Sequence, residues 1–186
     1  MEAETAGHVG RDVYEIHATP ARDRPGLTIE GIPRRAAAAE RIGAALVACR
    51  LPLPDFSVHV TVEPRDEPRT NGRSLSQLDL PIALAVLSLA SPGSVPSATY
   101  GNGRLTRDGW LHRWHERGRR VPWVPVVGIT CCPLSAVEPG LYPRWRAIIP
   151  VHHLNEAWRN VVTQILPFAD APCEARGADD PRLATW

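Results

Sequence analysis

The serine best placed for nucleophilic chemistry in this sequence is Ser76, which opens the apolar run Ser76–Ser88. A serine attacks a substrate only when a neighbouring base, such as histidine or lysine, removes its proton. The 186-residue chain contains no lysine, so a Ser–Lys dyad is impossible. His59 could act as the base in principle, although no spacing in the sequence brings it within reach of Ser76. The alternative is structural, because serine or aspartate at this position, Ser76 or Asp79, is also typical of a helix N-cap.

The segment 103–120 concentrates side chains that could bind nucleic acid. It holds six arginines, two tryptophans and two histidines against two acidic residues. Guanidinium groups bind phosphates and indole rings stack on bases, which together favour single-stranded nucleic acid as a ligand. The alternative is a solvent-exposed hairpin whose tryptophans pack back onto the sheet. The candidate phosphate or base contacts are Arg104, Arg107, Arg113, Arg117, Arg119, Arg120, Trp110 and Trp114.

Side chains that could bind a metal occur only as short pairs. These pairs are His112 and His115, Cys131 and Cys132, and His152 and His153. None has the spacing of a structural zinc site, and neighbours on a strand point to opposite faces. A phosphate-binding P-loop needs a lysine in its G-x-x-x-x-G-K-[ST] motif, so this chain cannot form one. We therefore expect no metal and no cofactor.

The elements that position these residues follow from the spacing of apolar side chains. Helical spacing predicts helices over Ala36–Cys49, Ser76–Ser88 and Leu154–Leu166, the second of them nearly fully buried. Alternation predicts strands over Val13–Ala18, Leu27–Gly31, Phe56–Glu63, Tyr100–Thr106, Trp123–Thr130 and Arg146–Val151. We expect the first two strands to form a hairpin. This order of elements predicts an α/β (α+β) fold, with helices packed on a mixed sheet.

Length and composition indicate one domain. A chain of 186 residues that is 44% hydrophobic can bury one full core. We expect this domain over residues 13–166, between a flexible N-terminus, 1–12, and a flexible C-terminal tail, 167–186. The four cysteines show no disulfide framework, and neither a signal peptide nor a span of about 20 apolar residues is present. These features favour a cytoplasmic protein with no membrane partner.

Three sequence features carry a resemblance to a known family. They are Gly31 and Pro33 at the end of a strand, the Phe56–Glu63 strand, and a helix that opens with LDLPIAL from Leu78. Together they resemble the N-terminal domain of the magnesium-chelatase subunit ChlI-like and competence protein ComM-like family. The similarity is weaker in GRLTRDGWL and RAIIPVHHLNEAW, and residues 113–144 diverge from the family.

The resemblance implies a fold shared with the second domain of a small-subunit ribosomal protein and with the Lon proteolytic domain. In the family, this domain precedes a P-loop ATPase, and the Lon relatives use a Ser–Lys dyad. Ser76 resembles the dyad serine, although Leu75 replaces the usual glycine. Because both chemistries need lysine, we expect a stand-alone, non-catalytic binding or assembly module that docks through a sheet edge or the arginine segment. An ATPase subunit or nucleic acid is the expected partner, and a degenerate serine hydrolase using Ser76 is the alternative.

Overall fold

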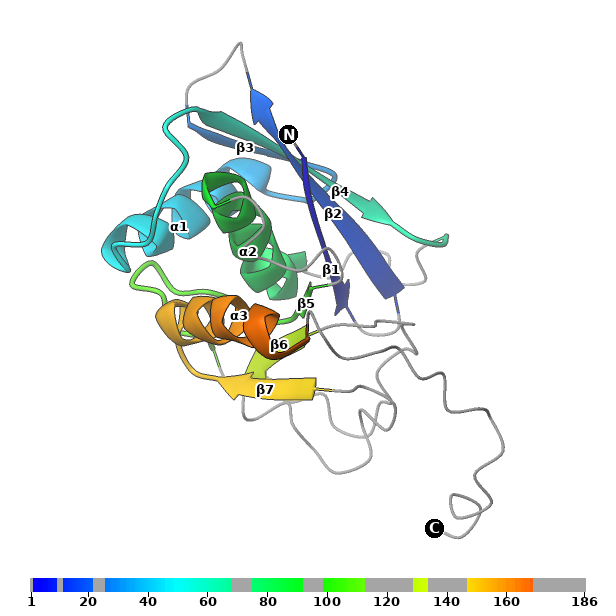
Figure 1. Cartoon of the computed structure of the whole chain (residues 1–186). Coiled ribbons are helices and arrows are strands. Elements are labelled where there is room, and N and C mark those ends of the chain that lie inside the picture. Colours follow the sequence, from blue (N-terminus) through cyan, green and yellow to red (C-terminus); the bar gives the residue numbers. More distant parts are fainter. Residues whose placement is uncertain are drawn as a thin grey trace, which may run out of the picture.

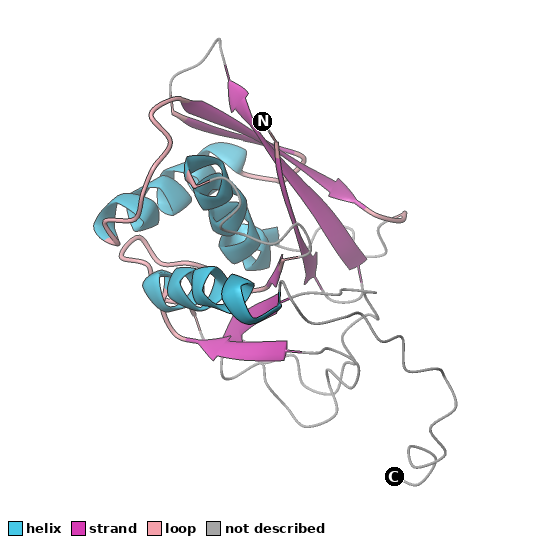
Figure 2. Cartoon of the chain, in the orientation of Figure 1, coloured by secondary structure: helices cyan, strands magenta, loops and turns pink. Residues whose placement is uncertain are grey.

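The chain folds into one mixed sheet with helices against it (Figures 1 and 2). A computed structural model describes residues 2–9, 12–21, 26–67, 75–91, 99–112, 129–133 and 147–168. The strands are β1 (Ala3–Val9), β2 (Asp12–Ala21), β3 (Leu27–Glu30), β4 (Ser57–Pro64), β5 (Tyr100–Gly101), β6 (Ile129–Pro133) and β7 (Ala147–Val151). The helices are α1 (Arg35–Ala48), α2 (Asp79–Ala90) and α3 (Leu154–Phe168), and the 3-10 turn η1 (Leu75–Leu78) precedes α2.

Within the described residues the sheet has seven strands, in the order β3-β4-β2-β1-β5-β6-β7. The pairs β1–β2 and β2–β4 are antiparallel, whereas β3–β4, β1–β5, β5–β6 and β6–β7 are parallel. Figure 2 shows the three helices gathered on one side of the strands. The expected mixed sheet with packed helices is therefore confirmed. No described helix covers the other face of strands β3, β4, β2 and β1. The side chains of β2 and β4 that point to this open face are mostly polar.

Most predicted elements match the structure to within a few residues. The three helices and the strands β2, β3, β4 and β7 all coincide with predicted segments. The expected strand Tyr100–Thr106 is shortened to β5, because the chain beyond Gly101 turns to meet the start of α2. Of the divergent region 113–144, only β6 belongs to the described residues, and of the expected tail only residues 167 and 168, at the end of α3, do.

The N-terminal segment is a central strand, not the loose terminus we expected. Strand β1 pairs with β2 along its whole length and with β5 on its other side. Its small residues are required by the packing: a Cβ at Gly7 would lie 2.8 Å from Leu78 Cδ2 and 2.9 Å from the Gly101 carbonyl oxygen. Thr5 donates a hydrogen bond to the Pro81 carbonyl (2.9 Å). Small side chains here permit close contact with η1 and α2. The segment is therefore well packed although it has few bulky apolar residues.

The expected hairpin between Val13–Ala18 and Leu27–Gly31, which correspond to β2 and β3, is also wrong. Strand β4 lies between β2 and β3, and the hairpin is instead formed by β1 and β2. Strand β3, helix α1 and strand β4 form a crossover unit with the two strands parallel. Alternation of apolar side chains identifies strands but not the strands that they pair with. In the observed order, β3 lies at an edge of the described sheet.

Helix α2 forms the centre of the core, as its uniformly apolar sequence predicts. All but two of its residues are buried, and it packs against β1, β2 and α1. The buried valines of β4, Val58, Val60 and Val62, alternate with partly exposed residues, so they face the helices. The fold thus presents two surfaces on which function could reside: the polar open face, and the edge formed by β3 and α1.

Candidate functional site

Ser76 lies in η1, the 3-10 turn that leads into α2. The N-cap position of α2 is Leu78, so neither Ser76 nor Asp79 occupies the N-cap position predicted for that helix. His59 alternates with the helix-facing valines of β4, so its ring projects from the open face of the sheet. There the Nδ1 atom of His59 lies 3.0 Å from Thr28 Oγ1. The sheet separates His59 from the helix layer that holds Ser76, and the structure does not bring the two together.

The carboxylate of Asp79 faces Arg41 of α1 instead. Arg41 Nε donates to Oδ2 (2.9 Å) and Nη2 donates to Oδ1 (2.8 Å), while the Leu105 N–H also donates to Oδ2 (3.1 Å). The Asp79 side chain is 1% exposed and that of Arg41 20%. Burial raises the pKa of Asp79, and the bonds from Arg41 and Leu105 act in the opposite direction. This pair fixes α1 against α2 and against the turn that contains Leu105.

Sequence reasoning missed the Arg41–Asp79 pair. Arg41 falls beside the apolar stripe of its helix, a position typical of solvent-facing residues. The two residues are 38 positions apart, so no local spacing connects them. The usable signal was Asp79 itself, a charged residue inside an otherwise apolar run, since a buried carboxylate needs a partner.

Cys49 and His153 both approach the position that a side chain at Gly109 would occupy, but they do not form an activated nucleophile. A side chain at Gly109 would overlap Cys49 Sγ and would lie 3.1 Å from His153 Nε2. His153 Nδ1 accepts the Asn155 N–H (3.2 Å), so Nε2 carries the hydrogen and donates to the Asp108 carbonyl (3.0 Å). Burial raises the pKa of the Cys49 thiol, which disfavours the thiolate. The three residues therefore have a packing role.

Three potential metal ligands meet on the open face of the sheet. Glu2 and Glu4 each place Oε1 3.4 Å from His17 Nδ1. The ligand atoms of all three lie within 4.8 Å of one another. Both carboxylates are exposed, and a protonated His17 would satisfy them as an ordinary surface ion pair. This cluster is accounted for without a metal.

Three of the eight candidate nucleic-acid contacts belong to the described residues. Arg104 and Arg107 are exposed, and Arg107 donates to Glu40 of α1. Trp110 is 54% exposed, and its ring meets that of His153 edge-on with centroids 5.0 Å apart. The indole therefore points to solvent and does not pack back onto the sheet. The other five, Arg113, Arg117, Arg119, Arg120 and Trp114, lie outside the described residues.

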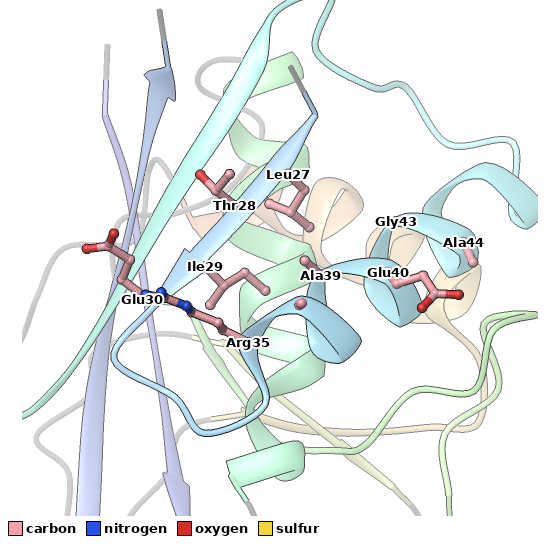
Figure 3. A pocket seen from close by; sticks show the side chains of 10 residues that line it. Leu27, Thr28, Ile29, Glu30, Arg35, Ala39, Glu40, Gly43 and Ala44 are labelled. Atoms are coloured by element: carbon pink, nitrogen blue, oxygen red, sulfur yellow. The ribbon is translucent and has the colours of Figure 1, made fainter. Parts of the chain in front are cut away.

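A groove of about 530 Å³ separates strand β3 from helix α1 (Figure 3). The strand side is formed by all four residues of β3, and small residues dominate the helix side. Those helix residues are Arg35, Ala36, Ala39, Glu40, Gly43 and Ala44. Alanine and glycine leave room above the strand that larger side chains would fill. The groove is consequently a structural result of the alanine-rich sequence of α1.

The turn at Gly31 sets the angle between β3 and α1. Gly31 has φ +83°, and a Cβ there would overlap the carbonyl oxygen of Val62 on β4. Only glycine combines this conformation with so close an approach. Arg34 follows in the left-handed region with φ 54° and starts α1 without a side-chain cap. The turn and the Arg41–Asp79 pair together hold α1 in the position that opens the groove.

Strand β3 presents unpaired backbone groups along this groove. The Val58 N–H donates to the Gly26 carbonyl (3.0 Å), which sets the parallel register with β4. In that register Gly26, Thr28 and Glu30 bond to β4, so the N–H and C=O groups of Leu27 and Ile29 point away from the sheet. Among the described residues β4 is the only strand that pairs with β3, and no turn or loop backbone hydrogen bond involves Leu27 or Ile29. An edge with free donors and acceptors is a template for one more strand.

Exposed apolar side chains occur at the end of α1 and in the connection that follows it. Val47 lies on the last turn of α1, while Leu53 and Phe56 lie in the connection from α1 to β4. In the described part of the chain these three and Trp110 are the large apolar residues classed as exposed. Val47 follows the groove-lining Gly43 and Ala44 by about one helical turn, so it extends that side of α1 with an exposed apolar side chain.

No family model and no curated protein matches this chain. The resemblance to the ChlI-like and ComM-like family thus remains a prediction from its motifs. No helix among the described residues has both the length and the apolar character needed to cross a membrane. The candidate functional site is accordingly assigned from geometry, and it is the β3–α1 groove with its unpaired strand edge.

Proposed function

We propose that this chain is a non-catalytic binding or assembly module, of the ChlI-like kind, that joins another protein strand to the edge of β3. The observation that carries the proposal is the pair of unpaired backbone positions, Leu27 and Ile29, beside an open groove. In β-strand addition, main-chain hydrogen bonds supply affinity and neighbouring pockets select side chains. The groove has both components, because the small residues of α1 leave space next to the free edge.

The chemistry of the groove defines the strand that fits it. Leu27 and Ile29 turn their side chains toward α1, so the facing residues of an added strand should be apolar. Thr28 and Glu30 lie on the open face, where polar partners fit. Arg35 lines the end of the groove beside Glu30 (Figure 3), and a carboxylate of the partner would suit it. The ligand is therefore an extended segment that alternates apolar and polar residues.

Catalysis is not part of this proposal. Cys49 lies near His153 but is buried and has a raised thiol pKa. His59 is separated from Ser76 by the sheet, and the hydroxyl near its Nδ1 belongs to Thr28 (3.0 Å). A fluorophosphonate probe should therefore leave the protein unlabelled. Labelling that disappears in Ser76→Ala would restore the hydrolase alternative.

The buried free thiol of Cys49 suits a reducing compartment, and we propose the cytoplasm.

A second binding function is favoured by one observation, the exposed indole of Trp110. Together with Arg104 it offers one stacking ring and one cation on the described part of the arginine segment. If this surface binds nucleic acid, Trp110→Ala should weaken the retention of a labelled single-stranded oligonucleotide in a filter assay. Equal retention by the wild-type protein and the variant would exclude this role for Trp110.

The main proposal is tested by panning a phage library of random decapeptides against the immobilised protein at nanomolar concentration. The enriched peptides are then measured by fluorescence polarisation against two variants. Leu27→Pro removes an outward N–H without removing a bond to β4, whereas Leu27→Ala keeps that N–H and trims the side chain. We expect Leu27→Pro to weaken binding at least ten-fold and Leu27→Ala to retain most of it. Peptides that bind both variants equally, or no enrichment, would overturn the proposal.

A further inference from the structure

The free edge of β3 is complementary to itself. Its two outward-facing residues, Leu27 and Ile29, are separated by one residue, Thr28. In an antiparallel pair, residues opposite each other at a hydrogen-bonded position exchange both N–H···O bonds. A two-fold axis through Thr28 places Leu27 of one copy opposite Ile29 of the other, and Ile29 opposite Leu27. Every outward N–H and C=O of these residues then has a partner.

We propose that β3 pairs antiparallel with β3 of a second copy of this chain, so that two seven-stranded sheets join about a two-fold axis at Thr28. The inference rests on the proposed strand-addition function and names the strand that is added. A two-fold contact of this kind is closed, because each copy uses its single β3 edge once. It therefore yields a dimer and not a fibre.

The side chains at the junction suit this pairing on both faces. On the helix side, apolar Leu27 meets apolar Ile29 of the second copy. On the open face, Thr28 meets Thr28 of the second copy at a non-hydrogen-bonded position, where Cα atoms lie about 4.5 Å apart. Threonine pairs at such positions are favourable in antiparallel sheets. Like residues thus face each other without placing a charge at the axis.

Charges at the two ends of the groove are also complementary under the two-fold axis. Arg35 and Glu30 line one end of the groove. Near its other end the Gly26 N–H donates to Ser57 Oγ (3.0 Å), and the exposed Asp55 lies two residues before Ser57 in the chain. Because the axis reverses the strand direction, the Arg35 end of one copy meets the Asp55 end of the other. Arg35 of one copy is therefore brought toward Asp55 of the other, while the side chain of Glu30 lies on the open face of the sheet.

The size of the contact sets the expected affinity. Stable interfaces bury at least about 1,000 Å² in total, and a four-residue strand pair alone falls short of that. The remaining area must come from α1, whose alanine-rich side lines the groove and lets two helices approach closely. An interface of this kind should give a reversible dimer that dissociates on dilution.

Charge substitutions at the axis test the inference. Thr28→Lys and Thr28→Glu each place two like charges face to face in a dimer, whereas a mixture of the two variants places opposite charges there. Thr61→Lys is the matched control, since Thr61 lies on the same face opposite Glu30, one strand further from the edge. Sedimentation equilibrium of the 20.4 kDa chain from about 1 to 500 μM (a span around the micromolar range) measures the dimer.

We expect the wild-type protein and Thr61→Lys to dimerise alike, and each Thr28 variant alone to dimerise at least ten-fold more weakly. An equimolar mixture of Thr28→Lys and Thr28→Glu should recover dimerisation to within a few-fold of wild type. A monomeric wild-type protein, or a dimer unaffected by charge at residue 28, would overturn the inference. So would a mixture that stays monomeric. Peptide binding that is sensitive to Leu27→Pro would still support the strand-addition function in each of those cases.

Discussion

Replacing Arg41 with methionine tests whether the buried ion pair holds helix α1 in place. Methionine keeps much of the length of the side chain. It leaves Asp79, which is 1% exposed, with the Leu105 N–H as its one remaining hydrogen-bond donor among the described residues. Breaking a buried pair in this way costs about 3–5 kcal/mol of unfolding free energy. Asp79→Asn should cost less, about 1–3 kcal/mol. The cost of Asp79→Asn is smaller because Arg41 is 20% exposed and can reach water, and because the asparagine oxygen can still accept the Leu105 N–H.

Urea unfolding followed by tryptophan fluorescence measures these costs, and the chain contains six tryptophans. If the slope of the unfolding free energy against urea concentration is unchanged, the substitution has altered only the stability of the fold. The double variant Arg41→Met with Asp79→Asn should be more stable than Arg41→Met alone, because it no longer buries an unpaired charge. If the double variant is less stable than Arg41→Met, or if Arg41→Met costs under about 1 kcal/mol (the range of an exposed pair), the reasoning is wrong.

The same pair gives a pH dependence with a definite sign. Burial raises the pKa of Asp79 above 3.8, and Arg41 opposes that rise. Loss of Arg41 should therefore raise the pKa of Asp79 further. A carboxyl group with a raised pKa in the folded state contributes most stability when protonated, and that contribution is lost as pH rises through the folded pKa. The deficit of Arg41→Met relative to wild type should thus be smallest in acid and should grow toward neutral pH.

Three further outcomes are expected from other parts of the structure. Gly31→Ala should destabilise the fold by about 3 kcal/mol or more in urea unfolding, because its Cβ would overlap the Val62 carbonyl, whereas Gly43→Ala, which meets open space, should not destabilise it. Burial lowers the pKa of His8 to about 3 from 6.5, so stability should be lost as pH falls below 6.5, and His8→Asn should flatten that loss. The buried Cys49 thiol should react with iodoacetamide only after unfolding, as peptide mass spectrometry can show; rapid alkylation of the native protein would contradict its raised pKa.

The parts of the fold that the sequence predicts are those encoded by local periodicity. Helix α2 and strand β4 show it most clearly, because uniform apolar character and strict alternation each determine burial directly. Strand β1 was missed because small residues were interpreted as a lack of packing, although Gly7 is small in order to admit Leu78. Propensity and periodicity describe one segment at a time, so they are blind to a constraint imposed by a segment far along the chain.

The candidate site was predictable only in part, for the same reason. An exposed sheet edge was expected as a docking surface, but which strand forms it depends on the pairing of β3 with β4, a contact between segments about 30 residues apart. The Arg41–Asp79 pair likewise joins two helices that are distant in sequence. The arginine segment drew attention through its composition, yet Arg107 is engaged by Glu40. Composition identifies groups that can bind a ligand, and only the fold shows which of them are already occupied.

Amide hydrogen exchange at β3, resolved by residue with NMR, tests the central claim most directly. In the dilute, unliganded protein, the N–H groups of Leu27 and Ile29 should exchange fast, while those of Thr28 and Glu30, which bond to β4, should be protected. Addition of a strand, by raising the protein concentration or by a panned peptide, should protect Leu27 and Ile29 specifically. Protection of these two amides in the dilute protein, or continued fast exchange when a strand is bound, would contradict the account.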